Sequence, residues 1–202
     1  MLAFIHGFNS SAASRTFGLL REVFPLAAAL EYPSGGYFAD NLALLQGQIA
    51  TITGAGSKDP GAALVLAGSS LGGFYAAQLS TMLHCPCALI NPVIRPHDAL
   101  RPFVGRQRHF HTGEEWEFTA AACESYAVFS DPRTTALPRL LVLGLSDELL
   151  DPLQSLAYWQ GHAHIHTTQD GHSLAAPDAV LLDWLRQQEE TQTRAEDETP
   201  FL

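Results

Sequence analysis

A serine in a glycine-rich pentapeptide is the residue of this chain best placed for nucleophilic chemistry. Residues 68–72 read Gly-Ser-Ser-Leu-Gly and match the pattern G-x-S-x-G. The apolar run 62–67 before it is typical of a strand buried on both faces, and a helical pattern follows. A tight strand-to-helix turn would lift the hydroxyl of Ser70 clear of a sheet. Because the same pentapeptide also occurs in turns without chemistry, other groups must support a nucleophilic Ser70.

A serine nucleophile needs a base, and the base needs a carboxylate to orient it. Asp147 follows the apolar run 139–143, and His172 lies in a glycine-flanked loop after the next predicted strand. The chain order is therefore Ser, Asp, His, which is the order of α/β-hydrolases rather than of chymotrypsin or subtilisin. Position favours Asp147 as the acid, with Asp151 as the second choice and Glu148 as a further alternative.

Ester chemistry at Ser70 would also need two backbone N–H groups to stabilise an oxyanion. One comes from the residue after the nucleophile and the other from the loop after the first strand, so we expect Leu71 and Phe8 to supply them. We expect His6, in the same loop, to be a hydrogen-bonded loop residue rather than a catalytic group.

Short apolar runs alternate with longer stretches of helical period, which predicts parallel strands joined by crossover helices. Loops after the carboxyl ends of such strands meet at one edge of the sheet, so residues distant in sequence converge there. A helix after residues 33–36 is expected to be capped by Asp40 or Asn41, and Ser14 is among the candidate caps of an earlier helix. The expected strands are 2–5, 27–32, 62–67, 86–90, 139–143 and 163–167, and further helices are expected near 13–23, 152–160 and 176–188.

The alternation stops between about 93 and 137, a stretch that we expect to be an inserted cap segment near the substrate. At 202 residues the chain fits one domain, which we place at 1–190. We expect the acidic tail 191–202 to be disordered.

Composition narrows the functional classes. Eleven Lys and Arg against 21 Asp and Glu give a net charge of -10, which disfavours nucleic acid as a partner. The sequence shows no signal peptide and no apolar run long enough to cross a bilayer, so we expect a cytoplasmic protein without a membrane partner. Three Cys do not form a disulfide framework, and Cys85 and Cys87 are expected to be buried apolar residues.

No cofactor is expected. The histidines at 162, 164 and 166 alternate along a predicted strand, but no Cys or carboxylate of suitable spacing joins them. We therefore expect no metal site there.

The motifs together resemble those of α/β-hydrolases, and within that superfamily the chain is similar to the YqiA-like small bacterial esterases (UPF0227). The resemblance implies a three-layer α/β/α sandwich and a cytoplasmic carboxylic ester hydrolase that prefers short acyl chains, with Ser70, Asp147 and His172 as the triad. The usual fold opens with two antiparallel strands that this chain lacks, so we expect a shortened, mostly parallel sheet of about six strands. The matching segments are 4–11, 68–76, 89–92, 112–114 and 146–148, together with Gly171-His172.

The sequence thus predicts a serine carboxylesterase that acts on a small-molecule ester. An acyl thioesterase or an acyltransferase could use the same triad, and arginines at 95, 101, 106 and 108 leave a coenzyme A thioester possible. A non-catalytic binding module on the same fold is the alternative from another class.

Overall fold

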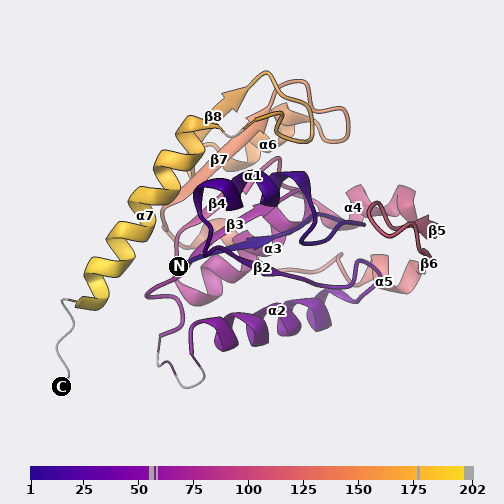
Figure 1. Ribbon diagram of the computed structural model, residues 1–202. Coiled ribbons are helices and arrows are strands. Elements are labelled where there is room, and N and C mark those ends of the chain that lie inside the picture. The colour runs from indigo at the N-terminus through magenta and orange to yellow at the C-terminus, as the bar shows by residue number, and fades with distance from the viewer. Residues whose placement is uncertain (55–56, 58, 177, 198–202) are drawn as a thin grey trace.

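The computed structural model describes residues 1–54, 57, 59–176 and 178–197, and its centre is a six-stranded sheet (Figure 1). The strand order is β2-β1-β3-β4-β7-β8, and every neighbouring pair is parallel. The chain therefore starts in the sheet, adds β2 on one side of β1 and then crosses to build the other side. This order confirms the predicted parallel α/β sheet. The strands are β1 (Leu2–Ile5), β2 (Ala28–Leu30), β3 (Val65–Ser69), β4 (Cys87–Ile90), β7 (Arg139–Gly144) and β8 (His164–Thr168).

Helices cover both faces of the sheet. Alternate residues of β1 point to opposite sides: Leu2 and Phe4 pack with helices α1 and α7, whereas Ala3 and Ile5 pack with α2, α3 and α6. This alternation, repeated in β3, buries both faces and produces the three-layer sandwich. The helices are α1 (Arg15–Val23), α2 (Phe38–Ile52), α3 (Leu71–Leu83), α6 (Pro152–Trp159) and α7 (Ala179–Asp197).

Between β4 and β7 the chain leaves the sheet and forms the segment 93–137, called the cap segment below. Its antiparallel hairpin β5–β6 lies beyond the carboxyl ends of the strands, at the right of Figure 1. Its elements are α4 (Pro96–Leu100), a 3-10 turn (Arg101–Phe103), β5 (Gly105–Arg108), β6 (Glu115–Phe118), α5 (Ala120–Glu124) and a second 3-10 turn (Pro132–Thr134).

The two predicted helix caps differ in outcome. The Ser14 side chain accepts a hydrogen bond from the Phe17 N–H and caps α1, as expected. The expected cap of α2 was wrong, because the helix begins at Phe38 without a side-chain cap. Asn41 is instead buried, and its amide donates to Pro33 O and to the hydroxyl of Tyr75.

The last helix is longer than predicted. α7 continues to Asp197, so residues 191–197 of the expected disordered tail are helical, whereas 198–202 lie outside the described residues. Glu, Gln, Arg and Ala in this stretch are good helix formers, and Glu189 pairs with the amino group of Met1 at 3.4 Å. In the part of the chain that is described, no helix has the length and apolar character needed to span a bilayer.

Candidate active site

Ser70 lies in the sharp turn between β3 and α3, where the sequence places it. Its φ of 57° and ψ of -123° are strained for a residue with a side chain. Neighbouring backbone holds this conformation: the Ser70 N–H donates to Ile90 O at 3.0 Å, and the Val93 N–H donates to Ser70 O at 3.1 Å. A Cβ on Gly68 would lie 2.2 Å from Gly72 O, so the tight turn requires glycine there. A strained serine turn of this kind suits a nucleophile.

Asp147 and His172 meet at the same edge of the sheet. His172 Nδ1 lies 3.0 Å from Asp147 Oδ1 and 2.9 Å from Oδ2, and the Asp147 side chain is only 2% exposed. Asp147 Oδ1 also accepts the N–H groups of Leu149 and Leu150. Burial raises the pKa of Asp147, but the hydrogen bonds from His172, Leu150 and Leu149 outweigh it and leave the pKa below its usual value. The carboxylate is therefore ionised and holds the imidazole through Nδ1, which leaves Nε2 for another partner.

The two alternative acids have other partners. Asp151 caps α6 by accepting the Leu153 N–H at 2.9 Å, and it also accepts the side chain of Gln154. Glu148 Oε2 accepts the backbone N–H of His172 at 3.0 Å, and this hydrogen bond lowers the pKa of Glu148. The structure thus brings Asp147 to the imidazole, while Glu148 holds the backbone of the histidine loop.

The loop after β1 runs against the Ser70 turn. A Cβ on Gly7 would lie 3.1 Å from Ser70 Cβ, and a Cβ on Gly72 would lie 2.1 Å from Ile5 O. These close approaches place Gly7, the residue directly before Phe8, beside the serine. Among the described residues, neither the Phe8 N–H nor the Leu71 N–H donates to a protein acceptor. Both N–H groups are therefore free for a ligand oxygen.

Asn91, at the end of β4, links the loops that carry these residues. Its Nδ2 donates to His172 O at 2.9 Å and to Gly171 O at 3.1 Å, and its Oδ1 accepts the Gly144 N–H at 2.8 Å. It is 2% exposed and has a φ of 43°. Because Ser70 bonds to the residue just before Asn91, this amide couples the serine turn to the histidine loop. Sequence reasoning assigned Asn91 no role, although an asparagine directly after a buried strand is a signal for a special backbone conformation.

The described contacts include no hydrogen bond between Ser70 Oγ and His172 Nε2. Catalytic hydrogen bonds are often long without substrate and tighten when it binds. The structure therefore joins the acid to the base directly, and joins the base to the nucleophile through the backbone and Asn91.

His6 is a structural part of the loop. It is 2% exposed, stacks on Tyr32 with ring centroids 4.6 Å apart, and its Nδ1 lies 2.8 Å from Gly7 O. Burial lowers the pKa of His6, so the ring is neutral at pH 7. It fixes the turn that leads to Phe8.

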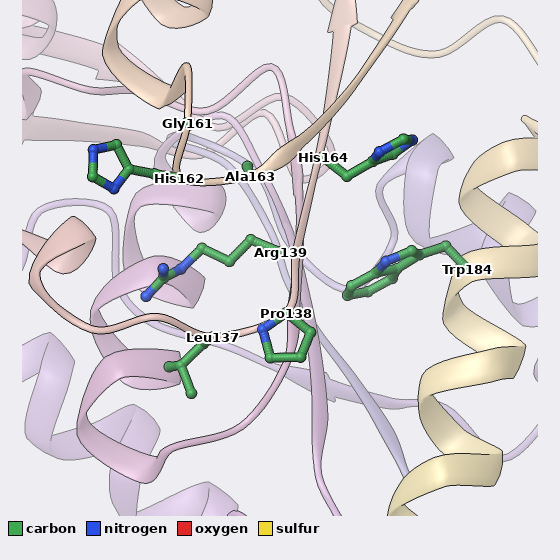
Figure 2. A pocket seen from close by; sticks show the side chains of 8 residues that line it. All are labelled: Leu137, Pro138, Arg139, Gly161, His162, Ala163, His164 and Trp184. Carbon is green, nitrogen blue, oxygen red and sulfur yellow. The ribbon is translucent and has the colours of Figure 1, made fainter.

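The alternating histidines that follow α6 lie away from this edge. His162 and His164 line a shallow hollow with Arg139 and Trp184, at the amino ends of β7 and β8 and thus opposite Asp147 (Figure 2). His166 instead binds Asp178 at 3.0 Å. Within the described ranges, no group of three His, Cys, Asp or Glu side chains is arranged to hold a metal. Cys85 and Cys87 are free, buried thiols whose pKa values burial raises.

Comparison with known structures identifies the fold. Est1E from Butyrivibrio proteoclasticus aligns with a TM-score of 0.67 at 15% identity, over 98% of this chain and 88% of that one. The Pyrococcus furiosus esterase Pf2001 aligns with a TM-score of 0.59 at 14% identity, over 97% of this chain and 78% of that one. E-2-(acetamidomethylene)succinate hydrolase aligns with a TM-score of 0.62 at 16% identity, over 94% of this chain and 91% of that one. The protein has the α/β-hydrolase fold.

The sequence also matches a family model. The uncharacterised protein family UPF0227 covers residues 1–179, and the chain belongs to this family. This match confirms the family to which the sequence motifs point.

Proposed function

We propose that the protein is a serine hydrolase that cleaves small, short-chain acyl esters. The observation that carries the proposal is the partly buried Asp147–His172 pair, linked through Asn91 to the strained turn that presents Ser70. The arrangement has the parts that ester hydrolysis needs: a hydroxyl, a base with an orienting carboxylate, and free N–H groups beside the hydroxyl.

In acylation each of these groups has its own role. As Ser70 Oγ forms a bond to the ester carbonyl carbon, His172 Nε2 takes the hydroxyl proton, and Asp147 stabilises the imidazolium that results. The Phe8 and Leu71 N–H groups stabilise the negative carbonyl oxygen. The carbon–oxygen bond to the alcohol then breaks, and His172 gives its proton to the leaving alcohol.

Deacylation repeats the steps with water. His172 takes a proton from water, the hydroxide oxygen bonds to the acyl carbon, and Ser70 leaves with the proton from His172. Acid and regenerated enzyme are the products.

The structural relatives support an ester substrate. One of them is the Pyrococcus furiosus esterase Pf2001, and Est1E is also known with ferulic acid bound, at a TM-score of 0.66 and 16% identity. A short-chain preference comes from the family resemblance, and an ester panel tests it.

The test is hydrolysis of p-nitrophenyl esters from acetate to decanoate by the wild type and by Ser70→Ala, with methyl ferulate and acetyl-CoA as additional substrates. We expect activity that is highest on short chains and at least about 10³-fold lower in Ser70→Ala. A fluorophosphonate should label the wild type and not the variant.

Equal activity in both proteins would refute Ser70 as the nucleophile. Faster turnover of acetyl-CoA than of any oxygen ester would instead identify a thioesterase. No activity and no labelling would favour the non-catalytic binding module.

A further inference from the structure

Asn9, the residue directly after Phe8, is bound by the cap segment at nearly every polar atom. Its Nδ2 donates to Arg108 O at 2.7 Å, its Oδ1 accepts the Trp116 Nε1–H at 3.1 Å, and its O accepts the Phe110 N–H at 3.2 Å. The Asn9 N–H donates to Ser34 Oγ at 2.7 Å. Three of these four hydrogen bonds come from the β5–β6 hairpin.

Asn9 also has the backbone conformation and burial of a fixed residue. It is 4% exposed and has a φ of 59°, a left-handed conformation that asparagine tolerates better than most side chains. A buried amide with all its groups paired has one arrangement, because any other leaves unpaired polar atoms. The position of this peptide is therefore tied to the position of the hairpin.

The neighbouring Phe8 is held by the same hairpin. Its ring packs against Trp116 and Phe118, with centroids 5.6 and 5.2 Å away, and against Phe103 at 5.5 Å. On the other side, Gly7 lies against Ser70. The Phe8 N–H thus lies between a glycine fixed by the serine turn and an asparagine fixed by the cap segment.

We infer that Asn9 is a positioning residue for the oxyanion hole, through which the β5–β6 hairpin sets the position of the Phe8 N–H. This inference rests on the proposed function. According to this inference, the hairpin positions a group of the active site in addition to lying near the substrate. Asn9 acts through Phe8, because its polar atoms bind protein groups.

The decisive variant is Asn9→Gly, since glycine keeps the left-handed backbone and removes only the amide. Loss of one oxyanion donor lowers kcat by about 10²–10³, so a displaced donor should lower kcat on p-nitrophenyl acetate by about tenfold to a hundredfold. KM should change by less than about twofold, because the lost interaction forms in the transition state. Inhibition by phenylboronic acid, which forms a tetrahedral adduct with a serine, should weaken by the same factor as kcat.

A second variant approaches the same link from the hairpin. Trp116→Phe keeps an aromatic ring beside Phe8 and removes the N–H that Asn9 accepts. We expect a smaller loss of kcat than in Asn9→Gly, because Trp116→Phe removes only one of the two side-chain hydrogen bonds of Asn9. The double variant should lose no more than Asn9→Gly, which already lacks that hydrogen bond. This variant also decides the matter if Asn9→Gly does not fold.

The matched control is Gln78→Ala. Gln78 is another buried amide that binds the cap segment, by donating to Ser130 O at 2.9 Å, and among the described residues its side chain makes no hydrogen bond to the loop after β1. The Gln78→Ala variant should melt at a lower temperature than the wild type and keep the wild-type kcat.

Wild type and Ser70→Ala belong in the same series, so that absence of Ser70-dependent turnover reports failure of the proposed function itself. With that turnover present, an unchanged kcat in Asn9→Gly would overturn the inference, and if Asn9→Gly does not fold, an unchanged kcat in Trp116→Phe would do so. A change in KM without a change in kcat would also overturn it. So would a loss of kcat in Gln78→Ala equal to that in Asn9→Gly.

Discussion

The acid of the candidate site is held by more than its histidine. Asp147 Oδ1 accepts the N–H groups of Leu149 and Leu150 at 2.8 and 2.9 Å, so the carboxylate cannot rotate without losing backbone partners. His172 is held in turn from its N–H by Glu148 and from its carbonyl by Asn91. The imidazole orientation is therefore determined before any substrate arrives, which electrostatic preorganisation requires.

Asp147→Asn tests this arrangement at the residue scale. The amide oxygen can keep the Leu149 and Leu150 bonds, so the amide nitrogen would face His172 Nδ1 and force the proton onto Nε2. That tautomer cannot accept the Ser70 proton, and we expect kcat to fall by about 10⁴ at neutral pH with the fold unchanged. Steady-state kinetics and circular dichroism measure the two effects.

Asp151→Asn is the control for the same loop. Asp151 caps α6 through the Leu153 N–H, and asparagine is also a good cap, so stability and activity should both stay near the wild type. A larger loss of activity in Asp151→Asn than in Asp147→Asn would move the acid role to Asp151.

At the scale of elements, the local pattern predicts the parallel strands because their apolar residues are contiguous and buried. It does not predict the β5–β6 hairpin, whose strands have only four residues each and read GRQR, which is polar, and EWEF, in which Glu alternates with aromatic residues. The pairing of this hairpin with the site depends on Asn9, whose partners lie about 100 residues away in sequence. The predicted cap of α2 is wrong because tertiary contacts take up the Asn41 side chain. The predicted end of α7 is wrong for a different reason, since the helix propensity of the tail outweighs its polar, acidic composition.

The same distinction applies to the candidate site. Ser70 lies in a local motif, and Asp147 and His172 follow predicted strands, so sequence alone singles out all three. Asn91 also follows a predicted strand, but nothing in the local sequence indicates its contacts with Gly144 and His172, 53 and 81 residues away. Residues that position a site through long-range hydrogen bonds become visible only in the fold.

Gly72 joins α3 to β1, and its replacement tests how tightly these elements must pack. A Cβ there would lie 2.1 Å from Ile5 O and 2.4 Å from His6 O, both backbone atoms that cannot move independently. We expect Gly72→Ala to lower the free energy of unfolding by about 3 kcal/mol, the upper end for overpacking. For a chain of this size, that lowers Tm by about 6–12 °C.

Gly47→Ala is the matched control, because Gly47 lies in the exposed face of α2 and the Cβ of an alanine there would have no neighbouring atom within 4 Å. Removing a helical glycine there should stabilise the protein by about 0.5–1 kcal/mol. Thermal melts of both variants give the comparison. A Gly72→Ala protein with the same Tm as Gly47→Ala would contradict the packing argument.

At the scale of the whole molecule, the cap segment is fastened to the sheet domain at several separate points. The hairpin binds Asn9, Gln78 binds Ser130, and Arg133 donates to Tyr158 O in α6 at 3.1 Å. Arg133 also lies over the Tyr158 ring, 3.9 Å from its centroid, and pairs with Asp131 at 2.6 Å. Because these anchors are widely spaced, we expect the cap segment to unfold together with the sheet and not as an independent lid.

The Asp131 anchor predicts how acid affects the protein. Hydrogen bonds from Arg133 lower the pKa of Asp131 to about 2, below the usual 3.8, although burial opposes this shift. Between these values the unfolded chain binds a proton that the folded chain does not, so this contribution to stability is complete above about pH 4 and is lost as the pH falls to about 2. Because the carboxylate is 41% exposed, solvent screening limits the contribution to about 1 kcal/mol, or about 2–4 °C in Tm.

Thermal melts from pH 6 to pH 2 should show Asp131→Asn melting lower than the wild type at pH 6 and converging with it near pH 2. Parallel curves over the whole range would show instead that the acid sensitivity arises elsewhere, with Asp147, whose pKa is also lowered, as the next group to replace.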